Sequence, residues 1–339
     1  MNSLINKKIC INRAILLLFL LGFIQSTHAQ QNSTKPGILM GKIICIDPGH
    51  GGSAATDSYR QGPTGEREEW IDLRVGLLLK EILEKRGAKV LMTRSSDVPV
   101  PLAERSKIAV ENKADFFISI HHNATADPSV NFPIIYYHGL ASENQAGVSF
   151  GKTLAKNLQK YMYKTKTPVS VVSDFTIFSG AGSSVLRGTY GIPGVLAEAS
   201  LFTNPEEESR LKTREHNYNE AYAIAAAIEK FFKKGNFTII PKTPSKFPPQ
   251  FATLQEADRM SAIARRWHQD YIDGKELMKK KDAESQQKAY DLFTQSARSF
   301  PDSYVAVKCH KYRAEILRKQ GKTDEAIKEE LRVKEFYPN

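Results

Sequence analysis

The chain has 339 residues, of which 41% are hydrophobic and 25% are charged, and its formal net charge is +11 at pH 7. These proportions are ordinary for a globular protein and exclude a disordered chain or one built mainly of membrane-spanning segments. The positive charge favours polyanionic partners such as an anionic cell wall. The sequence has no dense lysine and arginine runs interleaved with aromatic residues, so nucleic acid is not expected as a partner.

Residues 1–29 have the composition of a secretory signal peptide. Three basic residues precede an apolar stretch at 14–24, and "THA" at 27–29 matches the small-x-small cleavage pattern. The apolar stretch is shorter than the about 20 residues that span a bilayer. We therefore expect cleavage after Ala29 and a periplasmic protein without an integral membrane segment. An uncleaved N-terminal anchor is the alternative.

After this cleavage the chain keeps two cysteines, Cys45 and Cys309. The first lies in a predicted core strand and the second in a predicted helix of another domain, so we expect two free, buried thiols. Because no Cys-x-x-Cys pair occurs, a metal would not be held by sulfur.

Segments of strand and helix character alternate through the next part of the chain, which we predict as a catalytic domain at 40–235. Apolar runs of strand length occur at 42–46, 89–93, 115–120, 133–137 and 194–199. Helical spacing is seen at 70–87, and one ordinary helix is expected at 146–164. At "TNPEEE", Asn204 is the expected helix cap. This alternation predicts an α/β fold with a mainly parallel sheet and helices on both faces.

The chain changes character after residue 235. Residues 236–251 contain four prolines and are predicted to be a stiff linker. Residues 252–339 are predicted to form a small all-α region, in which two similar segments place Pro301 and Pro338 37 positions apart. This spacing is near the tetratricopeptide period of about 34, and a plain helical bundle fits equally well. Such helices bind a protein partner or pack back on the first domain.

Polar side chains follow three of the predicted strands. His50 follows the first strand, the pair His121 and His122 ends the third, and Glu198 lies in the last. Functional groups gather at the carboxyl edge of open α/β sheets, so these residues are expected to lie close together. Glu68, with Glu69 beside it, begins the long helix after the glycine turn.

Two imidazoles and one carboxylate, with a fourth position open to water, form a common catalytic zinc site. A further carboxylate can then transfer the proton of the attacking water. The residue types alone leave open which acid binds metal and which acts as base.

Each residue also has a structural interpretation. A single histidine after a strand is often only hydrogen-bonded. Adjacent side chains of a strand point in opposite directions, so one of His121 and His122 can join a site. Glu198 inside an apolar run needs a cation, hydrogen bonds or a chemical role, and a structural salt bridge is the alternative. The cluster "EREE" at 66–69 is expected to be a solvated helix start.

The order of these motifs resembles the zinc-dependent N-acetylmuramoyl-L-alanine amidases of bacterial cell walls, from about Lys42 to Phe232. The resemblance rests on four segments, "IDPGHGG", "TGEREEWIDLRV", "SIHHNA" and "VLRGTYGIPGVLAEASLFTNPEEE". The resemblance implies Zn²⁺ as cofactor and peptidoglycan as substrate. It also implies His50, Glu68 and His121 as zinc ligands and Glu198 as the catalytic acid and base, with His122 outside the metal sphere.

Two departures from the family pattern stand out: His122 replaces the usual small residue, and "LAEAS" replaces a more apolar stretch. Some members carry a helical arm that plugs the site, which we do not find between residues 124 and 185, so we expect a site open without an activator.

Two alternative functions stay open. One is a zinc peptidase acting within the stem peptide, and the other is a non-catalytic wall-binding scaffold.

Overall fold

The computed structural model describes residues 37–53, 60–139, 144–189, 191–235, 251, 258 and 260–338. The predicted signal peptide lies outside these residues, as does the predicted linker apart from Phe251. In the described part of the chain, no helix is both long enough and apolar enough to cross a membrane.

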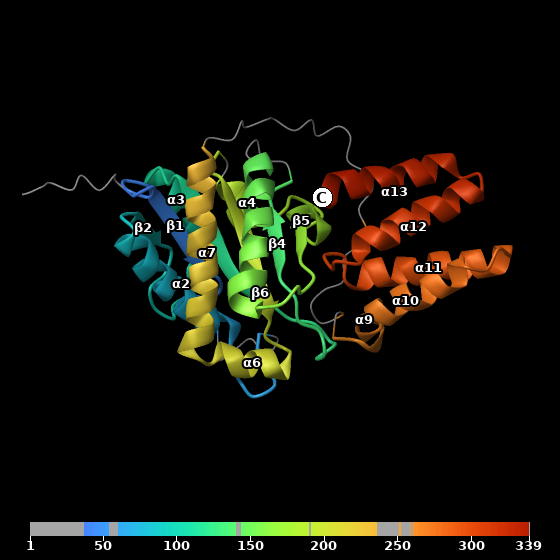
Figure 1. Ribbon diagram of the computed structural model, residues 1–339, viewed down its shortest axis with the longest axis horizontal. Coiled ribbons are helices and arrows are strands. Elements are labelled where there is room, and N and C mark those ends of the chain that lie inside the picture. The colour runs from blue at the N-terminus through green and yellow to red at the C-terminus, as the bar shows by residue number, and fades with distance from the viewer. Residues whose placement is uncertain are drawn as a thin grey trace, which may run out of the picture. The chain divides into compact units, whose positions relative to one another are not determined.

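A six-stranded sheet forms the centre of the fold (Figure 1). The strands are arranged in the order β2-β1-β3-β6-β4-β5, and their pairs are parallel except for β4 with β6. The predicted mainly parallel sheet is therefore confirmed. The strand bounds are β1 (Ile43–Pro48), β2 (Lys89–Met92), β3 (Phe116–Asn123), β4 (Ile134–Tyr137), β5 (Ser170–Ser173) and β6 (Gly194–Leu201).

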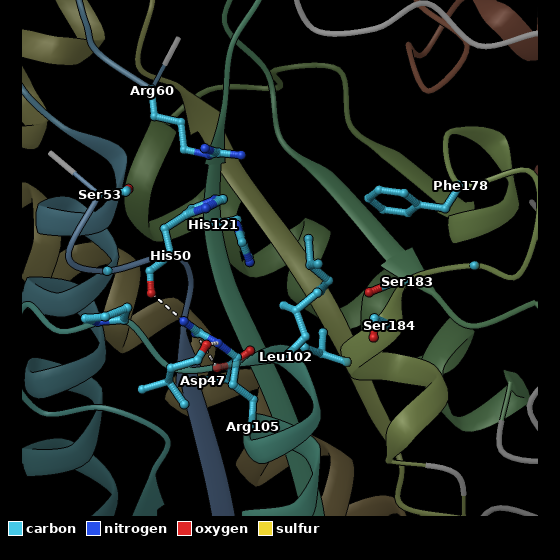
Figure 2. Close-up of a pocket in the computed structure, with 16 residues that line it drawn as sticks. Asp47, His50, Ser53, Arg60, Leu102, Arg105, His121, Phe178, Ser183 and Ser184 are labelled. Atoms are coloured by element: carbon cyan, nitrogen blue, oxygen red, sulfur yellow. Dashed lines mark hydrogen bonds and ion pairs between the residues drawn. The ribbon is translucent and has the colours of Figure 1, made fainter. Parts of the chain in front are cut away.

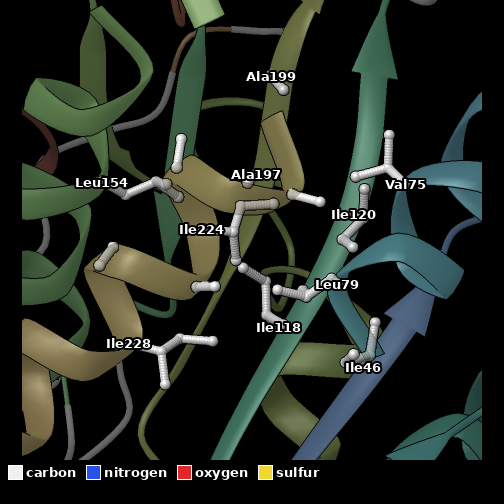
Figure 3. Close-up of a cluster of buried hydrophobic side chains, with 14 of the residues drawn as sticks. Ile46, Val75, Leu79, Ile118, Ile120, Leu154, Ala197, Ala199, Ile224 and Ile228 are labelled. Atoms are coloured by element: carbon white, nitrogen blue, oxygen red, sulfur yellow. The ribbon is translucent and has the colours of Figure 1, made fainter. Parts of the chain in front are cut away.

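Three long helices cover one face of the sheet, namely α2 (Glu68–Lys85), α4 (Asn144–Asn157) and α7 (Arg214–Lys234). They lie side by side in front of the strands in Figure 1. Their apolar side chains pack against the central strands, and Figure 3 shows Ile118 and Ile120 of β3 in one cluster with Leu79 of α2 and Ile224 of α7. Burial of this continuous apolar layer is the main favourable term for the sheet.

The opposite face is covered by α3 (Leu102–Glu111), α5 (Ser184–Gly188) and residues of the C-terminal helices. One apolar cluster joins Phe117 and Tyr136 of the sheet to Trp267, Phe300 and Phe336. The C-terminal helices pack on one another in chain order. Their bounds are α9 (Ala262–Arg265), α10 (Trp267–Met278), α11 (Ala283–Ser299), α12 (Ala306–Lys319) and α13 (Thr323–Phe336). The helical region therefore shares a core with the sheet.

Several local expectations can be compared with the structure. Asn204 caps α6 (Pro205–Leu211) by accepting from the Glu207 backbone N–H at 2.9 Å, as predicted. The helix predicted at 146–164 is not uniform, because α4 gives way to the π-helical segment η1 (Leu158–Tyr163). This wider segment ends with the Tyr163 hydroxyl donating to the Ala199 carbonyl at 2.9 Å, a tertiary contact that helical periodicity does not predict. The short elements α3, β5 and η2 (Asp174–Thr176) were not predicted either.

Both cysteines are free and buried, which confirms the prediction. Burial raises the pKa of the Cys45 thiol to about 12, and burial likewise raises the pKa of the Cys309 thiol to about 12. Both thiols are therefore protonated and unreactive at neutral pH.

A buried polar cluster holds α12 and α13 together. His310 Nδ1 lies 2.7 Å from a Glu329 oxygen, which also pairs with Arg313 at 3.3 Å. Phe251 stacks on His310, and the guanidinium groups of Arg313 and Arg332 lie over its ring at 4.5 and 4.4 Å. Burial, reinforced by the two guanidinium groups, lowers the pKa of His310 to about 4.

Substitution of His310 by Gln should reduce the acid sensitivity of the fold. Because the native pKa is depressed below the unfolded value of 6.5, the native state binds fewer protons and loses stability as the pH falls. From about pH 6.5 to below 4, this residue should cost about 3 kcal/mol of unfolding free energy, a loss absent from His310→Gln. Urea unfolding at a series of pH values measures it, with exposed His268→Gln as control. Equal pH profiles for His310→Gln and wild type would contradict the prediction.

Candidate active site

The glycine-rich turn after β1 brings His50 to the carboxyl edge of the sheet. His50 has a left-handed backbone, with φ of 54°, and is followed by two glycines that also have positive φ. A Cβ atom added to Gly49 would lie 2.3 Å from Cε1 of His121. Glycine at position 49 therefore lets the turn after β1 lie directly against the imidazole that comes from β3.

One carboxylate oxygen connects the two imidazoles. Glu68 Oε1 lies 3.0 Å from His50 Nε2 and 3.0 Å from His121 Nδ1. The two rings are edge to face, with centroids 4.7 Å apart. Ligand atoms of these three residues and of Asp72 all lie within 4.8 Å of one another. Nitrogen and oxygen donors at this spacing can share one divalent cation.

Glu198 lies beside this cluster on β6, where its backbone pairs in register with that of His121. Its Oε2 is buried without a hydrogen-bond partner in the described part of the chain. Burial, followed by the negative charges of Glu68 and Asp72, raises the pKa of Glu198 well above its ordinary value. The arrangement gives a carboxyl group that holds a proton readily next to the two imidazoles.

His121 and His122 are directed to different partners. His122 lies fully inside the protein, with Nδ1 2.8 Å from Asp72 of α2 and Nε2 3.0 Å from Glu220 of α7. Burial lowers the pKa of His122, but the two carboxylates outweigh burial and raise the pKa well above 6.5. His122 thus connects β3 to two helices through both of its ring nitrogens. Sequence analysis did not identify Asp72 or Glu220 as partners of His122. For Asp72 there was a usable signal, because it is an acidic residue between Ile71 and Val75 on an apolar helix face.

The start of α2 is not solvated as predicted. The four residues of the "EREE" cluster are all buried, with Glu68 only 4% exposed, so this prediction is wrong. Glu208 of α6 covers the preceding turn and accepts hydrogen bonds from the backbone N–H groups of Thr64 and Glu66. Within the cluster, Arg67 pairs with Glu69 at 3.2 Å. Tertiary contacts from a segment about 140 residues later in the chain cause this burial, and local sequence does not reveal them.

Two buried arginines hold the His50 turn by its backbone carbonyl groups. Arg94 donates to Pro48, Gly49 and Glu69, and Arg105 donates to Pro48 and His50. Arg105 also pairs with Asp47 at 2.9 Å. These contacts fix the left-handed turn that presents the His50 ring. The position of Arg94 directly after the second predicted strand could have indicated that it lies near the site. Nothing in the sequence distinguished Arg105 from other arginines.

A pocket of about 570 Å³ opens beside the cluster (Figure 2). His50 and His121 lie on one side, and Phe178, Ser183 and Ser184 lie across from them. Further lining comes from Pro99, Val100 and Leu102 and from Arg60 and Arg105. The pocket is therefore large enough to hold a small portion of a larger substrate, and polar side chains line it on both sides.

Replacement of Arg105 by Met should destabilise the fold strongly. Asp47 would keep its hydrogen bonds from Thr93 and Ser119 but lose its buried cation. Loss of one partner of a buried pair costs about 3–5 kcal/mol. Urea unfolding measures this cost, and Lys107→Met on the exposed side of α3 is the control. A loss below about 1 kcal/mol would show that the Arg105 contacts do not hold the turn.

Comparison with known proteins gives consistent matches over the sheet and its covering helices. A family model described as N-acetylmuramoyl-L-alanine amidase matches residues 44–230, more than half of the chain. The chain is 31% identical over 221 residues to "Probable cell wall amidase LytH" of Staphylococcus epidermidis, covering 62% of this chain and 67% of that protein. It is 27% identical over 238 residues to "N-acetylmuramoyl-L-alanine amidase AmiA" of Escherichia coli, covering 60% of this chain and 80% of that protein. The solved AmiC2 amidase of Nostoc punctiforme is 30% identical, with a TM-score of 0.48, over 57% of this chain and 97% of that chain.

Proposed function

The chain belongs to the N-acetylmuramoyl-L-alanine amidase family, and we propose that it uses zinc to hydrolyse the amide bond between N-acetylmuramic acid and L-alanine in peptidoglycan. His50, Glu68 and His121 would hold the ion, and Glu198 would act as general base and then general acid. The products are a free stem peptide and a glycan without that peptide.

The observation that carries this proposal is the convergence on Glu68 Oε1. His50 Nε2 and His121 Nδ1 both lie 3.0 Å from it, although the three residues come from separate parts of the chain. Two imidazole nitrogens and one carboxylate oxygen are a preferred zinc donor set that leaves a fourth position for water. When bound, zinc would lower the pKa of a water molecule to about 7 and polarise the amide carbonyl.

Glu198 suits proton transfer because of its surroundings. Its carboxylate takes a proton from the attacking water and passes it to the departing amine of L-alanine. Burial and the neighbouring negative charges raise the pKa of Glu198, which favours uptake of the water proton; Glu198 then donates this proton to the nitrogen as the C–N bond breaks. Asp72 and Glu220 hold His122 away from the pocket, which leaves His121 facing Glu68.

We further propose that the protein acts on the wall after export through the predicted signal peptide. The pocket is open beside His50 and His121 in the described structure, which supports activity without a separate activator. Mass spectrometry of fragments released from purified sacculi distinguishes amidase products from those of a stem-peptide peptidase. Intact stem peptides beginning with L-alanine are the expected result, and peptides cut internally would contradict the proposed bond.

Substitution of Glu198 by Gln should remove turnover and spare metal binding. A general base contributes about 10²–10⁴-fold to the rate, and glutamine cannot accept the proton. The release of stem peptide from sacculi gives the rate, and the zinc content of the purified variant gives the metal occupancy. A variant that digests sacculi at the wild-type rate would refute the role of Glu198.

Substitution of His121 by Ala should lower zinc affinity. It removes one of three donors, so titration of zinc into metal-free protein should show weaker binding and chelator should inactivate the variant at lower concentration. Exposed His268→Ala is the matched control and should bind one zinc like wild type. Equal zinc affinity of His121→Ala and His268→Ala would place the metal elsewhere.

A further inference from the structure

The wall of the pocket across from His50 and His121 is a loop that follows β5. Phe178, Gly182, Ser183 and Ser184 line the pocket there, and Figure 2 shows three of them facing the two imidazoles across the opening. A substrate bound at the imidazoles must therefore lie against this loop. The position of the loop then decides how well the substrate fits.

One buried carboxylate fixes this loop. Asp174 accepts hydrogen bonds from the backbone N–H of Ser183 at 2.7 Å and from that of Gly139 at 3.1 Å, and it pairs with His138 Nδ1 at 2.7 Å. A Cβ atom added to Gly182 would lie 2.5 Å from Asp174 and 2.7 Å from His138. The loop thus lies in direct contact with the Asp174–His138 pair and has little room to shift inward.

The residue after Asp174 joins this pair to the C-terminal helix. The Phe175 ring stacks on His138 at 5.8 Å and on Phe336 of α13 at 6.5 Å, with interplanar angles of 24° and 13°. Phe175 and Phe336 are both buried. The Tyr137 hydroxyl also donates to the Glu335 carbonyl at 3.1 Å. Three stacked rings therefore extend from the end of β4 to the end of α13.

We propose that Phe336 is a positioning residue for substrate binding. Through Phe175 and Asp174, it holds the wall formed by Phe178, Gly182, Ser183 and Ser184, so that the C-terminal helical region shapes the pocket without contacting substrate. Phe336 does not line the pocket, and it lies outside residues 44–230, which the family model matches. The inference rests on the proposed function, because it takes the muramoyl peptide as the ligand of this pocket.

The test compares Phe336→Ala with Leu331→Ala in the protein lacking residues 1–29. Leu331 is an exposed residue of the same helix and has no place in the ring stack. The probe is N-acetylmuramoyl-tripeptide, with KM and kcat measured on the zinc-loaded protein and Kd on the metal-free protein. A displaced wall loses contacts with the bound probe, so we expect KM and Kd to rise about tenfold for Phe336→Ala, which corresponds to about 1.4 kcal/mol of binding free energy. Zinc affinity and kcat should change less than about twofold.

Two further variants separate positioning from general loss of structure. Phe336→Leu fills much of the same volume and should recover most of the lost affinity. Phe178→Ala removes part of the wall itself, so the double variant Phe178→Ala/Phe336→Ala should lose less affinity than the sum of the two single losses. If Phe336→Ala fails to fold, Phe336→Val takes its place in the same double-variant comparison, because valine also removes the ring and leaves a smaller cavity than alanine does.

The inference fails if the folded Phe336→Ala or Phe336→Val variant binds the probe like Leu331→Ala, or if its effect adds fully to that of Phe178→Ala. It also fails if kcat and zinc affinity fall together with the affinity for the probe. Failure of the proposed function gives a different result. Wild-type protein would then bind the probe without releasing tripeptide, and the Kd comparison would still decide the role of Phe336.

Discussion

The parallel register of β1, β3 and β6 is the constraint on which the site depends. These strands are adjacent at the centre of the sheet, and their carboxyl ends bring His50, His121 and Glu198 to the same edge. Because side chains are buried on both faces of the sheet, the register is strongly specified. A shift of β3 by one residue would turn His121 toward the helices and His122 toward the pocket. The same strand register is therefore required both to pack the apolar core and to place the polar side chains of the site.

The site contains several buried ionisable groups, and Glu68, His122 and Asp72 each have a partner. Glu68, His122 and Asp72 are each removed from water, which is costly unless every charge has a partner. His122 lies between Asp72 and Glu220, while Arg105 pairs with Asp47 below the His50 turn. These pairs lock the ends of the strands to the helices around them. They contribute less to net stability than to fixing the direction of each side chain.

The fold class could be predicted from sequence because apolar runs of strand length and helical periodicity are local signals. His50 and His121 could be predicted to lie at the same edge of the sheet because they follow or end predicted strands, and Glu198 could be singled out because it interrupts an apolar run. The sequence did not reveal which residues from distant parts of the chain would contact these elements. Glu208 covers the start of α2 from a distant segment, so the "EREE" cluster is buried against expectation. The π-helical end of α4 is likewise associated with a contact from Tyr163 to β6 that no periodicity encodes.

The sharing of one apolar cluster between the sheet and the C-terminal helices has a consequence for biosynthesis. Phe117 and Tyr136 are translated well before Trp267 and Phe336, the residues that cover them. Domains that emerge early usually fold early. Here α3 and α5 are available early, but the part of this face around Phe117 and Tyr136 lacks its full cover until the helices from residue 260 onward have been made. The apolar cover of these two side chains is therefore completed only when the last helix of the chain is available to pack on them.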